Sequence, residues 1–233
     1  GHDQEGKEQI LKEVSFKNDE NTKDVFYFKT FQIKEGFLTM VELRNVTKNF
    51  SSKRVLRNIN LKLEKGKVYG LFGPNGVGKT TLLKIMAGYN KKTNGEYLIE
   101  GKEFNYKDKN YITFISDKEI FYGWMKVKDA VIYYKDFFED FDEKKCEDLL
   151  KSMKLDMGDK INVLSKGMKA RLKVALAISR HAKIYLLDEP LGGLDPLSRK
   201  IILDSIKTLM NKDGILIITS HLVNDVSDLI DHV

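Results

Sequence analysis

The sequence predicts an α/β fold in which a mostly parallel core sheet carries helices on both faces. Three short continuous apolar runs, at 68–72, 184–187 and 215–218, have the composition of strands that are buried on both sides. Stretches of helical periodicity separate these runs along the chain, and such alternation is typical of a doubly wound sheet. In such a sheet the ligand crevice lies at the carboxyl ends of the strands.

The region that precedes the first of these runs predicts a second sheet. Residues 41–46 and 59–63 alternate apolar and polar side chains, as half-buried strands do, so we expect an N-terminal antiparallel β portion. The clear pattern begins at Met40, and we interpret residues 1–39 as an extension or translated leader outside the fold. Within that segment, residues 25–33 alternate only weakly, which leaves a strand or no element open.

Helical periodicity predicts a mostly helical insert within the domain that spans residues 40–233. The region 118–180 contains no strand comparable to the buried runs, so we expect a helical subdomain there. The expected helices cover 79–87, 127–138, 143–153, 166–180, 197–210 and 222–230.

The composition excludes several classes of protein. Of the 233 residues, 42% are hydrophobic and 32% are charged, a balance that excludes intrinsic disorder. No apolar run approaches the roughly 20 residues that a membrane-spanning helix needs. The single cysteine, Cys146, excludes an internal disulfide framework and favours a soluble protein in a reducing compartment. The net charge of +6 comes from lysines interleaved with acids, so we expect a solvated surface and no nucleic-acid partner.

A phosphate-binding loop is the strongest signal in the chain. Residues 73–80 read Gly-Pro-Asn-Gly-Val-Gly-Lys-Thr and match G-x-x-x-x-G-K-[ST] between an apolar strand and a helical stretch. The glycines let backbone N–H groups surround a polyphosphate at the start of a helix. Lys79 supplies charge for the β- and γ-phosphates, and the Thr80 hydroxyl is a hard oxygen ligand for Mg²⁺. The fold class is therefore that of a P-loop NTPase; the alternative is a glycine-rich turn that only caps a helix.

Two adjacent acids follow the second buried strand. Asp188 and Glu189 come directly after the run 184–187, at the edge where the ligand crevice is expected. We expect Asp188 to lie near the metal and Glu189 to polarise an attacking water. The alternative is a strand end with two solvated acids.

The motif order resembles that of ATP-binding cassette (ABC) ATPases. Residues 164–168, Leu-Ser-Lys-Gly-Met, resemble the signature usually written LSGGQ, and the phosphate loop, the acid pair, Gly-Leu-Asp at 193–195 and His221 stand in the family's order. The resemblance runs from about Val41 to Val233. The stretch 114–117 and the Ser-Lys-Gly-Met signature are similar to the ATPase subunits of bacterial drug or antibiotic exporters whose permease is a separate chain.

The resemblance implies a site shared by two subunits, either identical chains or close paralogues. Ser165 and Gly167 would meet the γ-phosphate of ATP held by the partner, although Ser165 also reads as a plain helix N-cap. Phe50 would stack on adenine unless it is a core residue, and His221 would contact the γ-phosphate unless it is an exposed residue at a helix start. Asp195 would contact the opposing subunit and also reads as an N-cap.

The complete set of expected site residues follows from the motifs and the resemblance together. The expected catalytic residues are Glu189, His221, Lys79 and Asp188. The expected ATP-binding residues are Phe50, Gly73, Pro74, Asn75, Gly76, Gly78, Lys79, Thr80, Thr81, Ser165, Gly167 and Asp195. The expected Mg²⁺ ligands are Thr80, Asp117 and Asp188.

Three features depart from the family pattern. Asp117 stands where the family presents a glutamine to the metal, and Lys166 and Met168 replace a glycine and the glutamine of the signature. Family members usually continue beyond the position of Val233, so we expect a C-terminally truncated chain.

The aromatic run 121–124 follows the Asp117 position and is consistent with either a permease interface or core packing.

The function we expect is that of a transport motor. ATP would join two ATPase subunits, and hydrolysis would separate them and drive a separate membrane permease that exports a drug-like or peptide-like compound. The resemblance implies a cytoplasmic subunit attached to the inner face of the membrane through that permease. The alternative is a soluble, non-transport ABC ATPase that energises an assembly complex.

Overall fold

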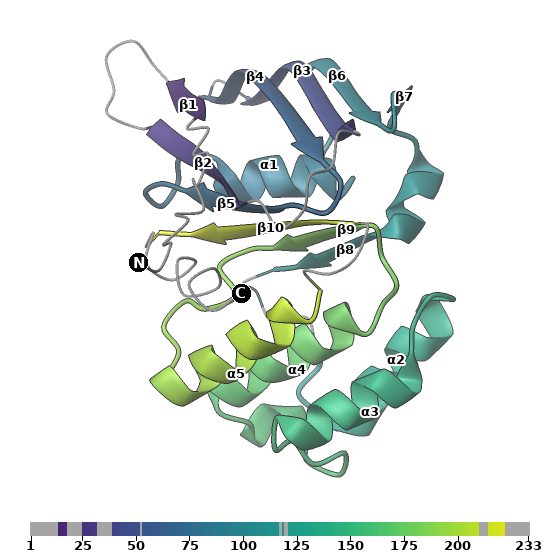
Figure 1. The fold of residues 1–233 in the computed structure, drawn as a ribbon. Helices are drawn as coiled ribbons and strands as arrows, with labels where there is room; N and C mark the ends of the chain where they lie inside the picture. The colour runs from purple at the N-terminus through teal and green to yellow at the C-terminus, as the bar shows by residue number, and fades with distance from the viewer. Residues whose placement is uncertain are drawn as a thin grey trace, which may run out of the picture.

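The computed structural model describes residues 14–17, 25–31, 39–51, 53–116, 118, 121–209 and 214–221 (Figure 1). The strands are β1 Val14–Lys17, β2 Val25–Phe31, β3 Thr39–Phe50, β4 Lys53–Glu64, β5 Val68–Phe72, β6 Asn94–Ile99, β7 Lys102–Glu103, β8 Ile112–Ile115, β9 Ile184–Leu187 and β10 Ile215–Ser220. The helices are α1 Lys79–Met86, α2 Val127–Phe137, α3 Glu143–Ser152, α4 Lys166–Ile178 and α5 Pro196–Lys207, with short 3₁₀ helices at Tyr106–Tyr111 and Ile161–Val163.

The core sheet brings the ends of four parallel strands to one edge. Its order is β1-β2-β5-β10-β9-β8, and β5, β10, β9 and β8 pair in parallel. Every residue of β5, β9 and β10 is buried, which explains why these strands read as continuous apolar runs. The predicted parallel core is confirmed. Because β10 lies between β5 and β9, the residue after β10, His221, lies between residue 73, which follows β5, and residue 188, which follows β9.

The N-terminal strands extend the same sheet. Within the segment that we expect to be an extension, β2 pairs antiparallel with β5, from Tyr27 opposite Phe72 to Phe31 opposite Val68. A strand is therefore the alternative that applies to residues 25–31. The origin of residues 1–39 and the domain boundary at residue 40 stay predictions.

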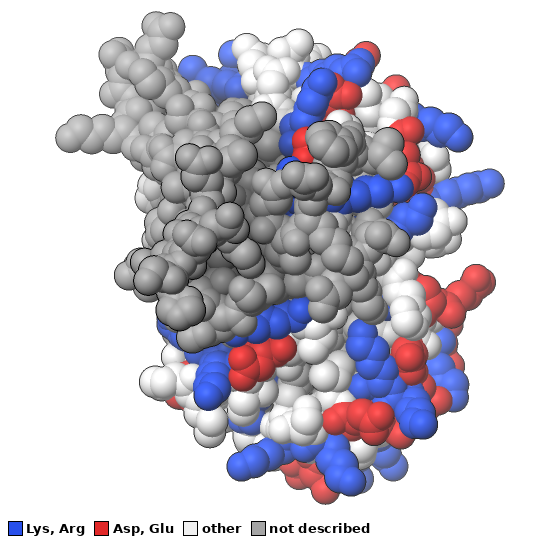
Figure 2. Space-filling view, in the orientation of Figure 1, with Lys and Arg blue, Asp and Glu red and all other residues white. Residues whose placement is uncertain are grey.

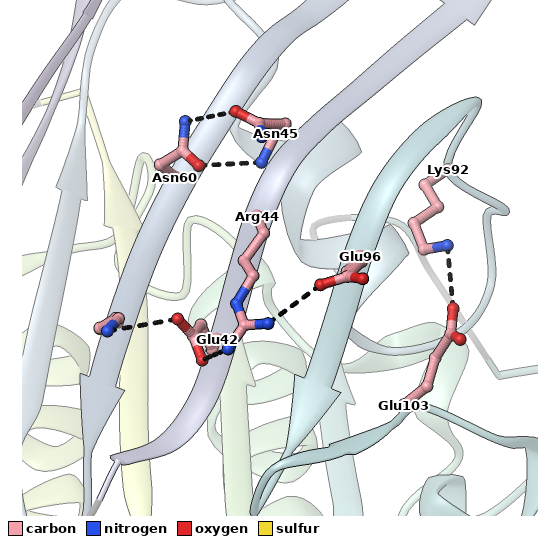
Figure 3. Close-up of polar contacts among 8 residues, drawn as sticks. Glu42, Arg44, Asn45, Asn60, Lys92, Glu96 and Glu103 are labelled. Atoms are coloured by element: carbon pink, nitrogen blue, oxygen red, sulfur yellow. Dashed lines mark hydrogen bonds and ion pairs between the residues drawn. The ribbon is translucent and has the colours of Figure 1, made fainter.

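The antiparallel sheet has one apolar and one polar face, as the alternation in β3 and β4 predicts. Its order is β4-β3-β6-β7, and α1 lies between it and the core sheet (Figure 1). Val41, Leu43 and Leu63 join the core between the two sheets. On the opposite face, Arg44 contacts Glu42 at 2.9 Å and Glu96 at 3.2 Å (Figure 3).

Helices α2 to α5 lie on the other side of the core sheet, where α2 and α3 pack on α4 (Figure 1). The region 118–180 holds α2, α3 and α4 and contains no strand among the residues described there, in agreement with the expected helical insert. Val131, Leu150 and Leu176 from these three helices share one core with Leu187 and Ile218 of the sheet. The helix expected at 222–230 lies outside the described residues.

The surface mixes both signs of charge. Lysine and arginine side chains alternate with aspartate and glutamate over the described part of the face in Figure 2, as the interleaving in the sequence predicts. None of the described helices has both the length and the apolar character that crossing a membrane requires.

The only cysteine of the chain should be unreactive in the native protein. Cys146 on α3 is fully buried, and burial raises the pKa of its thiol to about 12, so little thiolate exists at pH 8. We expect Ellman's reagent to label the native protein far more slowly than the protein in guanidinium chloride, which should give one equivalent. Rapid labelling of the native chain would contradict the buried position.

Candidate functional site: a phosphate loop beside two strand-end acids

The phosphate loop leaves the start of α1 open to an anion. Gly73, Gly76 and Gly78 all have positive φ angles, of 155°, 81° and 114°. Gly78 is the N-cap of α1, and no side chain caps the helix there. A Cβ atom at Gly78 would lie 2.8 Å from a methyl carbon of Leu56 and 3.2 Å from the Val55 carbonyl oxygen of β4. Glycine is therefore required for the loop to pack against β4, and the unpaired first-turn N–H groups of α1 can bind phosphate.

The Lys79 ammonium lies at the centre of this loop. The Lys79 side chain is 5% exposed, and its Nζ donates to the carbonyl oxygens of Gly73 at 2.6 Å and Pro74 at 3.1 Å. The same Nζ lies 3.6 Å from Oε1 of Glu189. A buried ammonium held by backbone carbonyls and one carboxylate can interact with the phosphates of a nucleotide that enters the loop.

A threonine of β10 orders the two acids that follow β9. The Thr219 hydroxyl donates to Oδ1 of Asp188 at 2.8 Å and accepts from the Glu189 N–H at 2.8 Å. Glu189 has a left-handed φ of 48°, a conformation that costs about 1–2 kcal/mol for a residue with a side chain. Its Oε2 lies 3.1 Å from Nδ1 of His221, the residue directly after β10. The strand order thus brings Lys79, Asp188, Glu189 and His221 together.

These groups line a cleft of about 780 Å³ between the phosphate loop and α4. The expected site residues that line it are Asn75, Gly76, Gly78, Lys79, Thr80, Thr81, Asp188, Glu189 and His221. The expected site residues do not include Thr219, Ser116 or the α4 lysines Lys166, Lys169 and Lys173, all of which except Thr219 line the cleft. The volume is within the range of sites that hold a nucleotide-sized ligand.

Other expected residues lie outside this cleft. Phe50, at the end of β3, is 45% exposed, with Nζ of Lys48 4.5 Å from its ring centre, and it is not among the described lining residues. Ser165 is the N-cap of α4, where its hydroxyl accepts from the Met168 N–H at 3.2 Å. The expected ligand Asp117 lies outside the described residues.

Asp195 and Gly167 connect the signature to α5. Asp195 caps α5 by accepting from the Ser198 N–H at 2.9 Å, and this hydrogen bond lowers the pKa of its carboxyl. Gly167 is buried, and a Cβ atom there would lie 2.3 Å from Oγ of Ser198 and 2.8 Å from Oδ2 of Asp195. Glycine therefore lets the start of α4 approach the start of α5, a close contact that the sequence alone did not reveal.

A parallel sheet whose strand ends carry a phosphate loop on one side and an ordered Asp-Glu pair on the other defines a P-loop nucleoside triphosphatase.

The comparisons with known proteins specify the family. Residues 56–192 match the family model described as ABC transporter. SrtF of Streptococcus pyogenes, a lantibiotic transport ATP-binding protein, is 32% identical over 83% of this chain and 85% of its own length. YcbN of Bacillus subtilis, an uncharacterized ABC transporter ATP-binding protein, is 32% identical over 82% of this chain and 64% of its own length.

Solved structures agree with these matches. The dimeric structure of MJ0796, a bacterial ABC transporter cassette, superposes with a TM-score of 0.70 at 25% identity, over 81% of this chain and 90% of the other. The chain belongs to the ABC transporter family, whose ATP-binding subunits hydrolyse ATP and work with membrane permeases. The predicted fold class, the resemblance and the ATPase activity are confirmed.

Proposed function

We propose that two copies of this subunit, or this subunit and a close paralogue, close around ATP and drive a separate permease that exports a peptide-like or drug-like compound. The observation that carries the proposal is the cleft in which Lys79 of the phosphate loop faces Glu189 at 3.6 Å. The lantibiotic transport function in the name of SrtF supports a peptide-like substrate.

The residues of the cleft have separate roles in this proposal. The N–H groups of the phosphate loop and the Lys79 ammonium bind the β- and γ-phosphates. Glu189 orients and polarises the attacking water, while His221 contacts the γ-phosphate from the neighbouring strand. Thr219 fixes Asp188 and the Glu189 backbone relative to one another.

The donor set fits Mg²⁺ that is held together with a nucleotide. Thr80 and Asp188 offer hard oxygen donors in the cleft, and Asp117 is the proposed third ligand. No group of three or more His, Cys, Asp or Glu side chains among the described residues could hold a metal ion. Mg²⁺ usually binds one or two protein ligands plus phosphates and water. When bound, Mg²⁺ would neutralise charge on the phosphates.

Exposed residues outside the cleft support a dimer. Ser165 and Asp195 are exposed and do not line the cleft of their own chain within the described residues, so a second subunit could present its nucleotide to them. In this arrangement a γ-phosphate would join two subunits, and its cleavage would weaken their association.

An aromatic pair supports contact with a permease. Tyr122 and Trp124 stack with ring centres 5.9 Å apart and are 69% and 72% exposed, whereas Phe121 packs against the helical core. Tyrosine and tryptophan are enriched in protein interfaces, so this pair is a suitable docking point for a cytoplasmic segment of the permease.

The Lys79→Ala substitution tests the assigned site. We expect ATP affinity to fall roughly tenfold or more, and phosphate release to fall to background, because charged hydrogen bonds to the phosphates are lost. Fluorescent-nucleotide titration and a phosphate-release assay measure the two effects. Lys84→Ala, on the same helix but outside the described cleft lining, is the matched control. Equal affinity and turnover in Lys79→Ala and wild type would contradict the site.

Co-purification separates the transport role from the alternative. A tagged chain expressed with its membrane proteins should bring down a multi-span membrane protein whose presence changes the rate of ATP hydrolysis. Recovery of only a soluble assembly complex would instead favour the non-transport ATPase.

A further inference from the structure

One face of α4 presents lysines to the nucleotide cleft, and one of them is buried. Lys166, Lys169 and Lys173 all line the cleft, at a spacing that places them along one side of the helix. Lys173 is only 9% exposed, whereas Lys166 is exposed and Lys169 is half-buried. Burying an ammonium group is costly unless it is hydrogen-bonded, so the contacts of Lys173 indicate what it does.

The Lys173 ammonium binds the backbone of the loop that follows β8. Its Nζ donates to the carbonyl oxygen of Ser116 at 3.2 Å and to that of Lys118 at 2.5 Å. Two carbonyl oxygens on either side of one peptide unit are thereby held by one side chain of α4. Because backbone carbonyls accept these bonds, they constrain the path of the backbone at Ser116 and Lys118.

This loop starts beside the proposed catalytic acids. The Asp188 N–H donates to the carbonyl oxygen of Ile115 at 2.9 Å, so the residue that precedes the loop is bonded to the start of the acid pair. Ser116 itself lines the cleft. The residue that the chain places between the two bound carbonyls is Asp117, our proposed metal ligand. A shift of Ser116 would therefore change the lining of the cleft beside Asp188.

We propose that Lys173 is a positioning residue that ties the backbone of Ser116 and Lys118 to α4, so that Ser116 keeps its place in the cleft beside the acids. The inference rests on the proposed function of the cleft and adds a residue to it. Lys173 does not touch the nucleotide in this proposal; it acts through the loop. Catalytic groups displaced by about 1 Å can cost up to 100-fold in rate, so its removal should be measurable.

Two substitutions at this position test the proposal. Lys173→Met keeps the length and apolar stem of the side chain but removes the donors, and Lys173→Arg restores donors that can reach two carbonyl oxygens. Lys151→Met, on the exposed side of α3, is the matched control for loss of a lysine charge. For each variant we would measure kcat, the KM for ATP, the Mg²⁺ concentration for half-maximal turnover, the affinity for a fluorescent ATP analogue and the melting temperature.

We expect Lys173→Met to lower kcat roughly tenfold and to raise the Mg²⁺ requirement, with nucleotide affinity within about twofold of wild type. Lys173→Arg should recover most of the rate and the wild-type Mg²⁺ requirement. A Lys173→Met protein within twofold of wild type in kcat and Mg²⁺ requirement would overturn the inference. The inference would also be overturned if the fall in kcat were accompanied by a matching fall in melting temperature and Lys173→Arg did not restore kcat. A wild-type chain without ATP turnover would count against the proposed function instead.

Discussion

Replacing Glu189 by glutamine should leave ATP binding intact and lower ATP hydrolysis at least about 100-fold. Glutamine preserves the shape of the side chain, but its amide cannot accept a proton from the attacking water. The position matters because Glu189 is held on three sides, by Thr219 at its backbone, Lys79 at one carboxylate oxygen and His221 at the other. Phosphate release at saturating ATP and Mg²⁺ measures the effect.

Nucleotide affinity in the Glu189→Gln protein should be equal to or higher than that of wild type. The carboxylate lies 3.6 Å from Nζ of Lys79, so in the empty cleft it competes with phosphate for that ammonium. Removing its charge removes the competition while the phosphate loop is unchanged. Because the bound ATP is no longer cleaved, we also expect a dimer that forms on size-exclusion chromatography with ATP and not with ADP.

A glutamate outside the cleft provides the control. Glu143 on α3 also pairs with a lysine, Lys135 at 2.7 Å, but both side chains are at the surface. Glu143→Gln should therefore hydrolyse ATP at the wild-type rate. Near-wild-type turnover in Glu189→Gln would remove the general-base role from Glu189, and loss of ATP binding in the same protein would point to a structural role.

The parts of the fold that the sequence predicts best are those with a strong local cause. The bounds expected for β5 and β9 agree with the structure to the residue, because both strands are apolar runs buried on two faces and followed by glycine or acid. Strand β8, Ile112–Ile115, was not predicted as a strand, since four residues with a central threonine give no distinct period. Strand β6 begins Asn-Gly-Glu and carries too little apolar signal to be recognised.

The residues of the site also fall into two groups, those that a local motif predicts and those that depend on the packing of distant segments. The phosphate loop and the acid pair are contiguous motifs, so their residue types alone indicate the chemistry. Thr219 depends on the register between β9 and β10, where Ile218 lies opposite Leu187, and no local pattern encodes that register. Lys173 reads as a solvated helix lysine in the sequence, because only the packing of α4 against the loop after β8 makes it buried.

Replacing Arg180 by methionine should lower the free energy of unfolding by roughly 3 kcal/mol, because a partly buried ion pair and two further hydrogen bonds are lost together. The Arg180 side chain is 3% exposed and contacts Asp140 through Nε at 2.9 Å and Nη2 at 3.1 Å. It also donates to the carbonyl oxygens of Ile112 at 2.8 Å and Asn110 at 2.6 Å, and its guanidinium lies 3.9 Å from the Phe138 ring centre. One side chain thus joins the segment between α2 and α3 to the first residue of β8.

Methionine fills much of the arginine volume but leaves Asp140 and two carbonyl groups without these donors. The loss should appear as a fall of about 10 °C in the melting temperature, since 1 kcal/mol corresponds to roughly 2–4 °C for a chain of this size. Thermal unfolding followed by circular dichroism measures it. Combining Arg180→Met with Asp140→Asn should cost less than the sum of the two single substitutions, because the same ion pair is removed in both.

Arg44 on the outer face of the antiparallel sheet is the matched control. It too contacts two carboxylates, Glu42 and Glu96, but its side chain is 52% exposed (Figure 3). Water and salt screen an exposed pair, so Arg44→Met should change the melting temperature little. If the melting temperature of Arg180→Met were as close to that of wild type as the melting temperature of Arg44→Met, burial would not explain any stabilisation by the Arg180 contacts. A large loss at Arg180 alone would show that the helical insert is joined to the core sheet at β8, the strand whose other end leads to the loop held by Lys173.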